Sequence, residues 1–97
     1  MNQGNKARLA ARINGRVQGV GFRFFVRENA SRLDLRGWVR NRKDRSVEVT
    51  AEGETSDLEQ LLRALEQGPR GAQVDEVTYQ WETATGEYNS FKIKLSF

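Results

Sequence analysis

The segment from residue 15 to residue 23 constrains the fold of this chain more than any other. Its sequence is G-R-V-Q-G-V-G-F-R, so three of its nine residues are glycine. Before it, small or apolar side chains alternate with polar ones over residues 9–17, the pattern of a strand with one buried face. After it, the spacing becomes that of a helix with one inward face, formed by Phe22, Phe25, Val26, Asn29, Ala30 and Leu33. The segment therefore predicts a tight connection between a strand and a helix.

This connection has the features of an anion-binding loop. Glycines at such a turn allow successive backbone N–H groups to converge on one point, beside the positive end of the helix dipole. Arg23, in the first helical turn, supplies a planar guanidinium that can hold a phosphate through two hydrogen bonds. The predicted phosphate-binding loop comprises Gln18, Gly19, Val20, Gly21, Phe22 and Arg23. A glycine pattern by itself fits a purely structural turn equally well.

The composition excludes several kinds of chemistry. The 97 residues include no cysteine and no histidine. Disulfides, thiolate nucleophiles, phosphohistidine and most transition-metal sites are thereby excluded, and we expect neither a metal nor a cofactor. The length predicts a single domain over residues 8–97, preceded by a polar, disordered tail at residues 1–7. No apolar run suits a membrane span or a secretory signal, so the expected location is cytoplasmic.

Charge is distributed unevenly along the chain. Residues 1–45 contain twelve Lys and Arg against three Asp and Glu, whereas residues 46–97 contain four against ten. The basic half includes the glycine-rich segment, so its field would concentrate an anionic ligand there. A basic face is also typical of nucleic-acid binding, so charge alone does not separate the two functions.

The rest of the chain shows the periodicity of four more strands and one more helix. Strands are predicted at residues 36–41 and 46–53, joined by the polar turn R-K-D-R. Ser56 and Glu59 form a capping box that would start a helix, and Gly68-Pro69 would end it. Its apolar stripe comprises Leu58, Leu61, Leu62 and Leu65. The last two strands have apolar positions at Val77, Tyr79 and Trp81, and at Phe91, Ile93, Leu95 and Phe97.

The order β-α-β-β-α-β with a final strand predicts an α+β fold. Strands with one apolar face, together with two amphipathic helices, indicate an antiparallel sheet with both helices on one face. This is the ferredoxin-like sandwich. The leucine and aromatic residues of these patterns are expected in its core, and Trp38 is expected to pack rather than to bind a ligand.

A second motif lies at the end of the strand over residues 36–41. Residues 37–41 read G-W-V-R-N, and Asn41 falls where the strand gives way to a turn, a place where asparagine is common for local reasons. The two ordered motifs, G-R-V-Q-G-V-G-F-R and G-W-V-R-N, closely resemble those of the acylphosphatase family. The resemblance extends from about Leu9 to Phe97, since the element order also matches.

The resemblance implies an enzyme that hydrolyses acyl phosphates to a carboxylate and inorganic phosphate. It implies that Arg23 binds the phosphate and that Asn41 orients the attacking water. It also implies the strand order 4-1-3-2, with the last strand added at an edge. Little covalent help is needed, because a carboxylate is already a good leaving group and positioning and electrostatics can supply most of the catalysis. With no His, no Cys and no clustered carboxylates near the loop, the enzyme is expected to be metal-independent. The expected partner is a small acyl phosphate, with inorganic phosphate as product inhibitor, no nucleic acid, no membrane, and a monomeric protein.

Two residues depart from the pattern of the family. Asp34 stands where a glycine normally closes the first helix, and Arg45 where a glycine normally completes the hairpin turn. We expect positive φ at both, which aspartate tolerates moderately and arginine poorly.

Two alternatives remain open at this stage. RRM-type RNA-binding modules share the element order and the basic charge, but they stack bases on aromatic residues of the first and third strands. The corresponding strands here, at residues 9–17 and 46–53, contain none. The other alternative is a non-catalytic ligand-binding domain.

Overall fold

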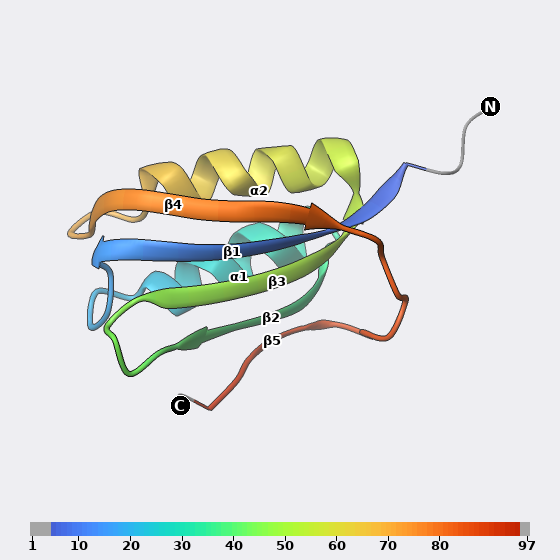
Figure 1. Cartoon of the computed structure of the whole chain (residues 1–97). Helices are drawn as coiled ribbons and strands as arrows, with labels where there is room; N and C mark the ends of the chain where they lie inside the picture. The colour runs from blue at the N-terminus through green and yellow to red at the C-terminus, as the bar shows by residue number, and fades with distance from the viewer. Residues whose placement is uncertain (1–4, 96–97) are drawn as a thin grey trace.

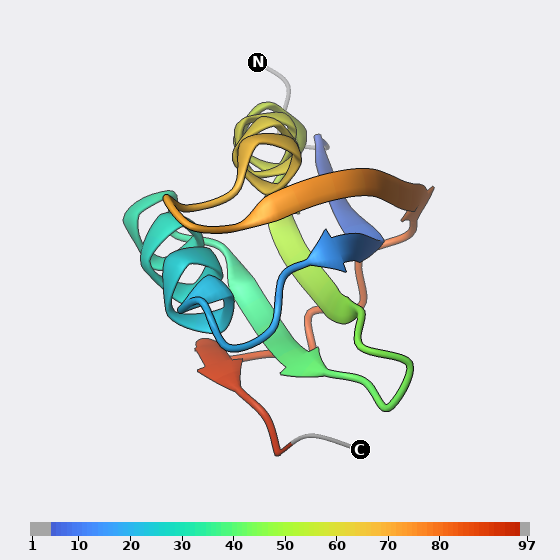
Figure 2. The same ribbon diagram turned by 90° about the vertical axis from the view of Figure 1, so that its left-hand side faces the viewer.

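Two helices cover one face of a five-stranded sheet in the computed structural model, which describes residues 5–95 (Figures 1 and 2). The spatial order of the strands is β4-β1-β3-β2-β5. This confirms the predicted ferredoxin-like α+β fold and its strand order. The elements are β1 (Lys6–Arg16), α1 (Phe22–Arg32), β2 (Arg36–Asn41), β3 (Val47–Glu54), α2 (Thr55–Gln67), β4 (Gln73–Glu82) and β5 (Phe91–Ile93).

The sheet is mixed, so the prediction of a wholly antiparallel sheet is wrong at one edge. β1 pairs antiparallel with β3 and β4, and β2 pairs antiparallel with β3, but β5 pairs parallel with β2. The reason is visible in Figure 1, where β4 ends at the end of the sheet from which β2 starts. A strand formed soon after that point must run in the same direction as β2.

A buried carboxylate on the open face of the sheet anchors the connection between β4 and β5. Glu52 is only 6% exposed and accepts hydrogen bonds from the backbone N–H groups of Thr85 and Gly86, both at 2.9 Å. Arg8 Nε donates a further hydrogen bond at 2.8 Å. Burial alone would raise the pKa of Glu52, but these hydrogen bonds lower it overall. An ionised Glu52 thus holds the connection against the sheet.

Trp38 lies on the same open face and packs as predicted. Its Nε1 donates a hydrogen bond to the Tyr88 hydroxyl at 3.3 Å. Lys94 Nζ lies 4.4 Å from the centroid of its ring, and the Arg40 guanidinium carbon 5.3 Å. The contacts with Tyr88 and Lys94 link β2 to the segments on either side of β5.

The core lies between the sheet and the helices, but two aromatic residues expected there lie outside it. Tyr79 is 48% exposed and Trp81 41% exposed. Both belong to β4, which is an edge strand, and their rings contact each other with centroids 6.5 Å apart. An edge strand lacks a neighbour on one side, so the inward side of its pleat is only partly covered.

The terminal strand is shorter than predicted. β5 ends at Ile93, and Leu95 is 92% exposed, so Leu95 is not a core residue. The predicted core position Phe97 lies outside the described residues. At the other end, β1 already begins at Lys6, within the segment predicted to be a tail. Of that tail, residues 1–4 lie outside the described residues.

Helix α2 starts without the predicted capping box. Its first residue is Thr55, and Glu54 is the N-cap residue with no hydrogen bond from its side chain. The helix follows β3 directly, and the Thr55 N–H is already used, since it donates to the Asn5 carbonyl at 2.8 Å. The predicted end is correct, because Gly68 is the C-cap residue of α2 and has a φ of 72°.

The two residues expected at positive φ are found there. φ is 61° at Asp34 and 76° at Arg45. Arg45 completes the turn between β2 and β3, in which its N–H donates to the Arg42 carbonyl at 3.1 Å. The Arg42 N–H in turn donates to the Ser46 carbonyl at 2.9 Å. This is a turn closed by one left-handed residue, a position that favours glycine.

Replacing Arg45 with glycine is therefore expected to stabilise the domain. The left-handed conformation costs a non-glycine residue about 1–2 kcal/mol. The greater freedom of glycine in the unfolded chain offsets roughly 0.4–1 kcal/mol of that gain. A net gain near 1 kcal/mol would raise Tm by about 4–8 °C in a domain of this size. Measuring the Tm of Arg45→Gly by thermal unfolding tests this prediction. The catalytic rate of the variant should be unchanged. A lower Tm would contradict the assigned turn geometry.

Candidate active site

The two sequence motifs meet in one small hollow. Figure 2 shows the connection between β1 and α1 passing beside the end of β2. There the structure forms a hollow of about 110 Å³ lined by Val17, Gly19, Gly21, Phe22, Arg23, Phe24 and Asn41. Arg23 and Asn41, which are 18 positions apart in the chain, therefore line the same site. The predicted loop residues Gln18 and Val20 do not line it.

The backbone of the loop has the conformation that its glycines allow. φ is 76° at both Gly19 and Gly21, the left-handed region that other residues rarely adopt. Gly21 is the N-cap residue of α1, and the first turn of this helix contains no acidic residue. Glycine offers no side-chain acceptor to the N–H groups of that turn. These N–H groups and the helix dipole are thus available to an anion.

Arg23 is half-buried at the start of α1, beside this hollow. The ion pairs of residues 5–95 do not include its guanidinium, so no carboxylate of the described chain neutralises it. An arginine held at a concave site without an acidic partner is well suited to bind an oxyanion.

Asn41 is the last residue of β2 and pairs with Val47 of β3. Its side-chain oxygen is buried and accepts no hydrogen bond from residues 5–95. Buried polar atoms are rarely left without a partner, so this acceptor is suited to a donor that enters the hollow. A water molecule is such a donor.

The side chain of Gln18 forms structural hydrogen bonds that the sequence did not indicate. Its Nε2 donates hydrogen bonds to the backbone carbonyls of Arg42 and Ser46, both at 2.9 Å. The glycine loop is thereby tied to the turn that follows Asn41. Gln18 can contribute to anion binding only through its backbone N–H, and its side chain holds the two halves of the site together. Phe22, also predicted in the loop, lines the hollow although its side chain is buried in the core.

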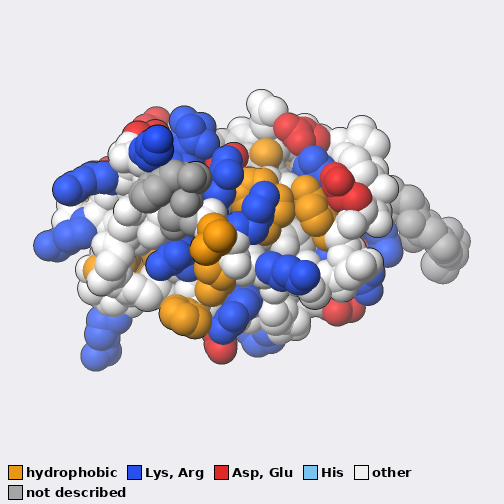
Figure 3. All heavy atoms as spheres, turned by 90° about the horizontal axis from the view of Figure 1, so that it is seen from below, with side chains coloured by type: hydrophobic (Ala, Val, Ile, Leu, Met, Phe, Trp, Pro, Cys, Tyr) orange, Lys and Arg blue, Asp and Glu red, His pale blue; other side chains and the backbone are white. Residues whose placement is uncertain are grey.

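The surface around this end of the molecule is basic. Figure 3 shows Lys and Arg side chains gathered toward the left of the view, the end that holds the glycine loop and the β2–β3 turn in Figure 1. Arg40 and Arg42 are nevertheless engaged, because both donate to Glu48 Oε1, at 2.9 and 3.1 Å. Burial alone would raise the pKa of Glu48, but hydrogen bonds from these two arginines lower it overall. They are less available to a ligand than Arg23.

A family model for acylphosphatase matches residues 9–93. The chain belongs to the acylphosphatase family. An acylphosphatase of Salinibacter ruber is 49% identical over 94 residues, covering 97% of this chain and 99% of the relative. Among solved structures, acylphosphatase from Bacillus subtilis superposes with a TM-score of 0.88 at 34% identity, covering 91% of this chain and 98% of that one. An acylphosphatase from Coxiella burnetii also gives a TM-score of 0.88, at 35% identity, covering 97% of this chain and 100% of that one.

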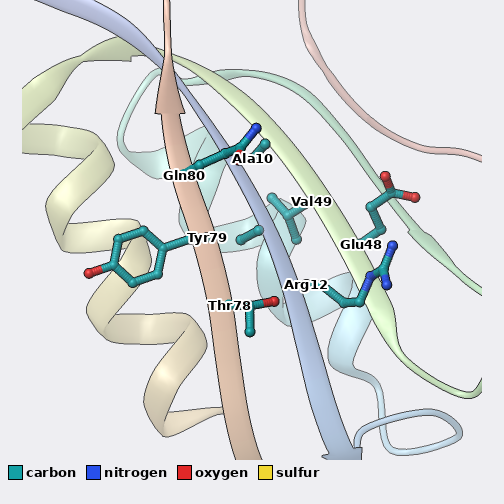
Figure 4. A pocket seen from close by; sticks show the side chains of 8 residues that line it. Ala10, Arg12, Glu48, Val49, Thr78, Tyr79 and Gln80 are labelled. Atoms are coloured by element: carbon teal, nitrogen blue, oxygen red, sulfur yellow. The ribbon is translucent and has the colours of Figure 1, made fainter.

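A second hollow, on the open face of the sheet, bears on the RNA-binding alternative to an acylphosphatase. It measures about 260 Å³ and lies over β4, β1 and β3 (Figure 4). Its lining includes Ala10, Arg12, Glu48 and Gln80, and the ring of Tyr79 points away from it toward α2. RRM-type modules need aromatic side chains on the first and third strands of this face. β1 and β3 have none, so this face lacks the base-stacking side chains of those modules.

Proposed function

We propose that this member of the acylphosphatase family hydrolyses acyl phosphates at the hollow between the glycine loop and the end of β2. The observation that supports this most directly is that Arg23 and Asn41 line the same hollow and that the Asn41 side-chain oxygen has no partner among residues 5–95. The first can hold a phosphate and the second can hold a water. A small-molecule acyl phosphate is the proposed partner of a monomeric, cytoplasmic enzyme. No helix within residues 5–95 is both long and apolar enough to cross a membrane.

In the proposed reaction the phosphoryl group occupies the glycine loop. The N–H groups of the loop and of the first turn of α1, the helix dipole and the Arg23 guanidinium would meet the charge on its oxygens. Asn41 would accept a hydrogen bond from a water and direct it at phosphorus, in line with the leaving carboxylate. The new P–O bond forms as the bond to the acyl oxygen breaks. The proton of the water passes to an oxygen of the substrate phosphate.

Removal of metal ions is expected to leave the activity unchanged. Within residues 5–95 no three Asp or Glu side chains gather into a group that could hold a metal ion. The groups proposed to bind the phosphate are cationic or N–H donors, which do not coordinate a cation. Hydrolysis rates before and after treatment with EDTA test this prediction. Loss of activity that a divalent ion restores would contradict it.

The function itself is tested with purified protein and acetyl phosphate. Loss of the acyl phosphate and release of inorganic phosphate are measured together, with added phosphate as inhibitor. Hydrolysis with competitive inhibition by phosphate is the expected result, because the product would occupy the loop. A labelled single-stranded RNA added to the same preparation tests the alternative. RNA binding without hydrolysis would overturn the proposal.

A further inference from the structure

The hollow that holds the proposed phosphate site is too small to enclose a substrate with a bulky acyl group. It measures about 110 Å³, whereas pockets that enclose a drug-sized ligand measure roughly 300–1,000 Å³. Its lining comes from the glycine loop, the first turn of α1 and Asn41, the groups proposed to hold the phosphate and the water. A bulky acyl group must therefore extend out of the hollow and across its rim, whereas an acetyl group need not.

Phe24 is an exposed apolar side chain at this rim. It lines the hollow and is 59% exposed, so it contributes little to the core. Its neighbours along the helix behave differently, because Phe22 is buried and its ring contacts that of Phe25 at a centroid distance of 5.9 Å. The other large apolar side chains that are exposed within residues 5–95 do not line this hollow; they are Tyr79, Trp81 and Leu95.

Arg27 supports the ring of Phe24 from the next turn of α1. The Arg27 guanidinium carbon lies 5.1 Å from the centroid of the ring, which is a cation–π contact. The ion pairs of the described residues leave Arg27 without an acidic partner. A cation thus contacts the ring, and at 59% exposure Phe24 still offers apolar surface to a ligand.

We infer that Phe24 contacts the acyl group of the substrate and favours acyl phosphates whose acyl group is apolar and ring-bearing. This inference rests on the proposed function. In-line attack requires the water on Asn41 and the leaving carboxylate to lie on opposite sides of phosphorus. The acyl group therefore extends away from Asn41 at the end of β2, and Phe24 lines the same hollow from a different element, α1. An aromatic ring at that place offers an offset-stacked or edge-to-face contact to a second ring.

The test compares benzoyl phosphate with acetyl phosphate in wild type and Phe24→Ala. The variant is expected to lower kcat/KM for benzoyl phosphate about fivefold to tenfold, mainly through KM, because a ground-state contact is lost. For acetyl phosphate, which is too small to reach the ring, kcat/KM stays within about twofold. Inhibition by inorganic phosphate is unchanged. Phe24→Tyr keeps the ring and retains the preference.

Tyr79→Ala is the matched control, because it removes a similarly exposed aromatic ring from the far edge of the sheet. This variant should leave kcat/KM unchanged for both substrates. If Phe24→Ala lowered kcat/KM equally for both substrates, or left kcat/KM for benzoyl phosphate unchanged, the role assigned to Phe24 would be overturned. Hydrolysis of acetyl phosphate by wild type would still uphold the proposed function. Wild type that hydrolyses neither substrate would instead refute the proposed function, and this inference with it.

Discussion

Replacing Arg23 with lysine is expected to lower kcat/KM for acyl phosphate hydrolysis at least about a hundredfold. Lysine keeps the positive charge but cannot form the planar, two-pronged contact of a guanidinium. Charge-assisted hydrogen bonds contribute about 1.5–3 kcal/mol each, and the loss of two accounts for the expected factor. The affinity for inorganic phosphate should fall in parallel, because the same contact holds the product. Steady-state kinetics with phosphate as inhibitor measure both effects.

Arg32→Lys is the matched control for this variant. Arg32 lies in the last turn of the same helix, is exposed and donates to Asn29 Oδ1. Its replacement should change neither the rate nor the inhibition. If Arg23→Lys kept its activity within about threefold of wild type, Arg23 would not be the phosphate ligand.

Replacing Asn41 with alanine is expected to lower kcat about 10²–10³-fold with little change in phosphate inhibition. The side-chain oxygen has no partner among residues 5–95, so its removal breaks no hydrogen bond of the described structure. The backbone pairing of Asn41 with Val47 remains. The variant should therefore fold normally, which circular dichroism and thermal unfolding verify.

Comparing the effect of Asn41→Ala on kcat with its effect on inhibition by phosphate separates two roles for Asn41. A residue that orients water affects the chemical step, whereas a residue that binds the phosphate affects both quantities equally. Asn89→Ala, on the connection that precedes β5, provides a control for loss of an amide side chain. An equal loss of rate and inhibition in Asn41→Ala would assign Asn41 to phosphate binding instead.

Local patterns were sufficient to predict the element order and the two motifs of the site. The start of α1 agrees with the predicted one, because a change from period 2 to period 3.6 marks it directly. The bounds of β2 agree as well, and the polar turn at residues 42–45 marks its end. Positive φ at Asp34 and Arg45 was expected from the resemblance, because glycine normally stands at both places in the family, and the structure has it at both.

The tertiary structure alone decided which surfaces are covered and which polar groups find partners. Periodicity identifies the apolar side of β4 but not that Tyr79 and Trp81 lie at an uncovered edge. Gln18 bonds to carbonyls 24 and 28 positions away, and Glu52 to N–H groups 33 and 34 positions away. The parallel course of β5 likewise depends on where β4 ends in space. Local sequence determines the conformation of each segment, whereas burial and long-range hydrogen bonds depend on which other segment lies against it.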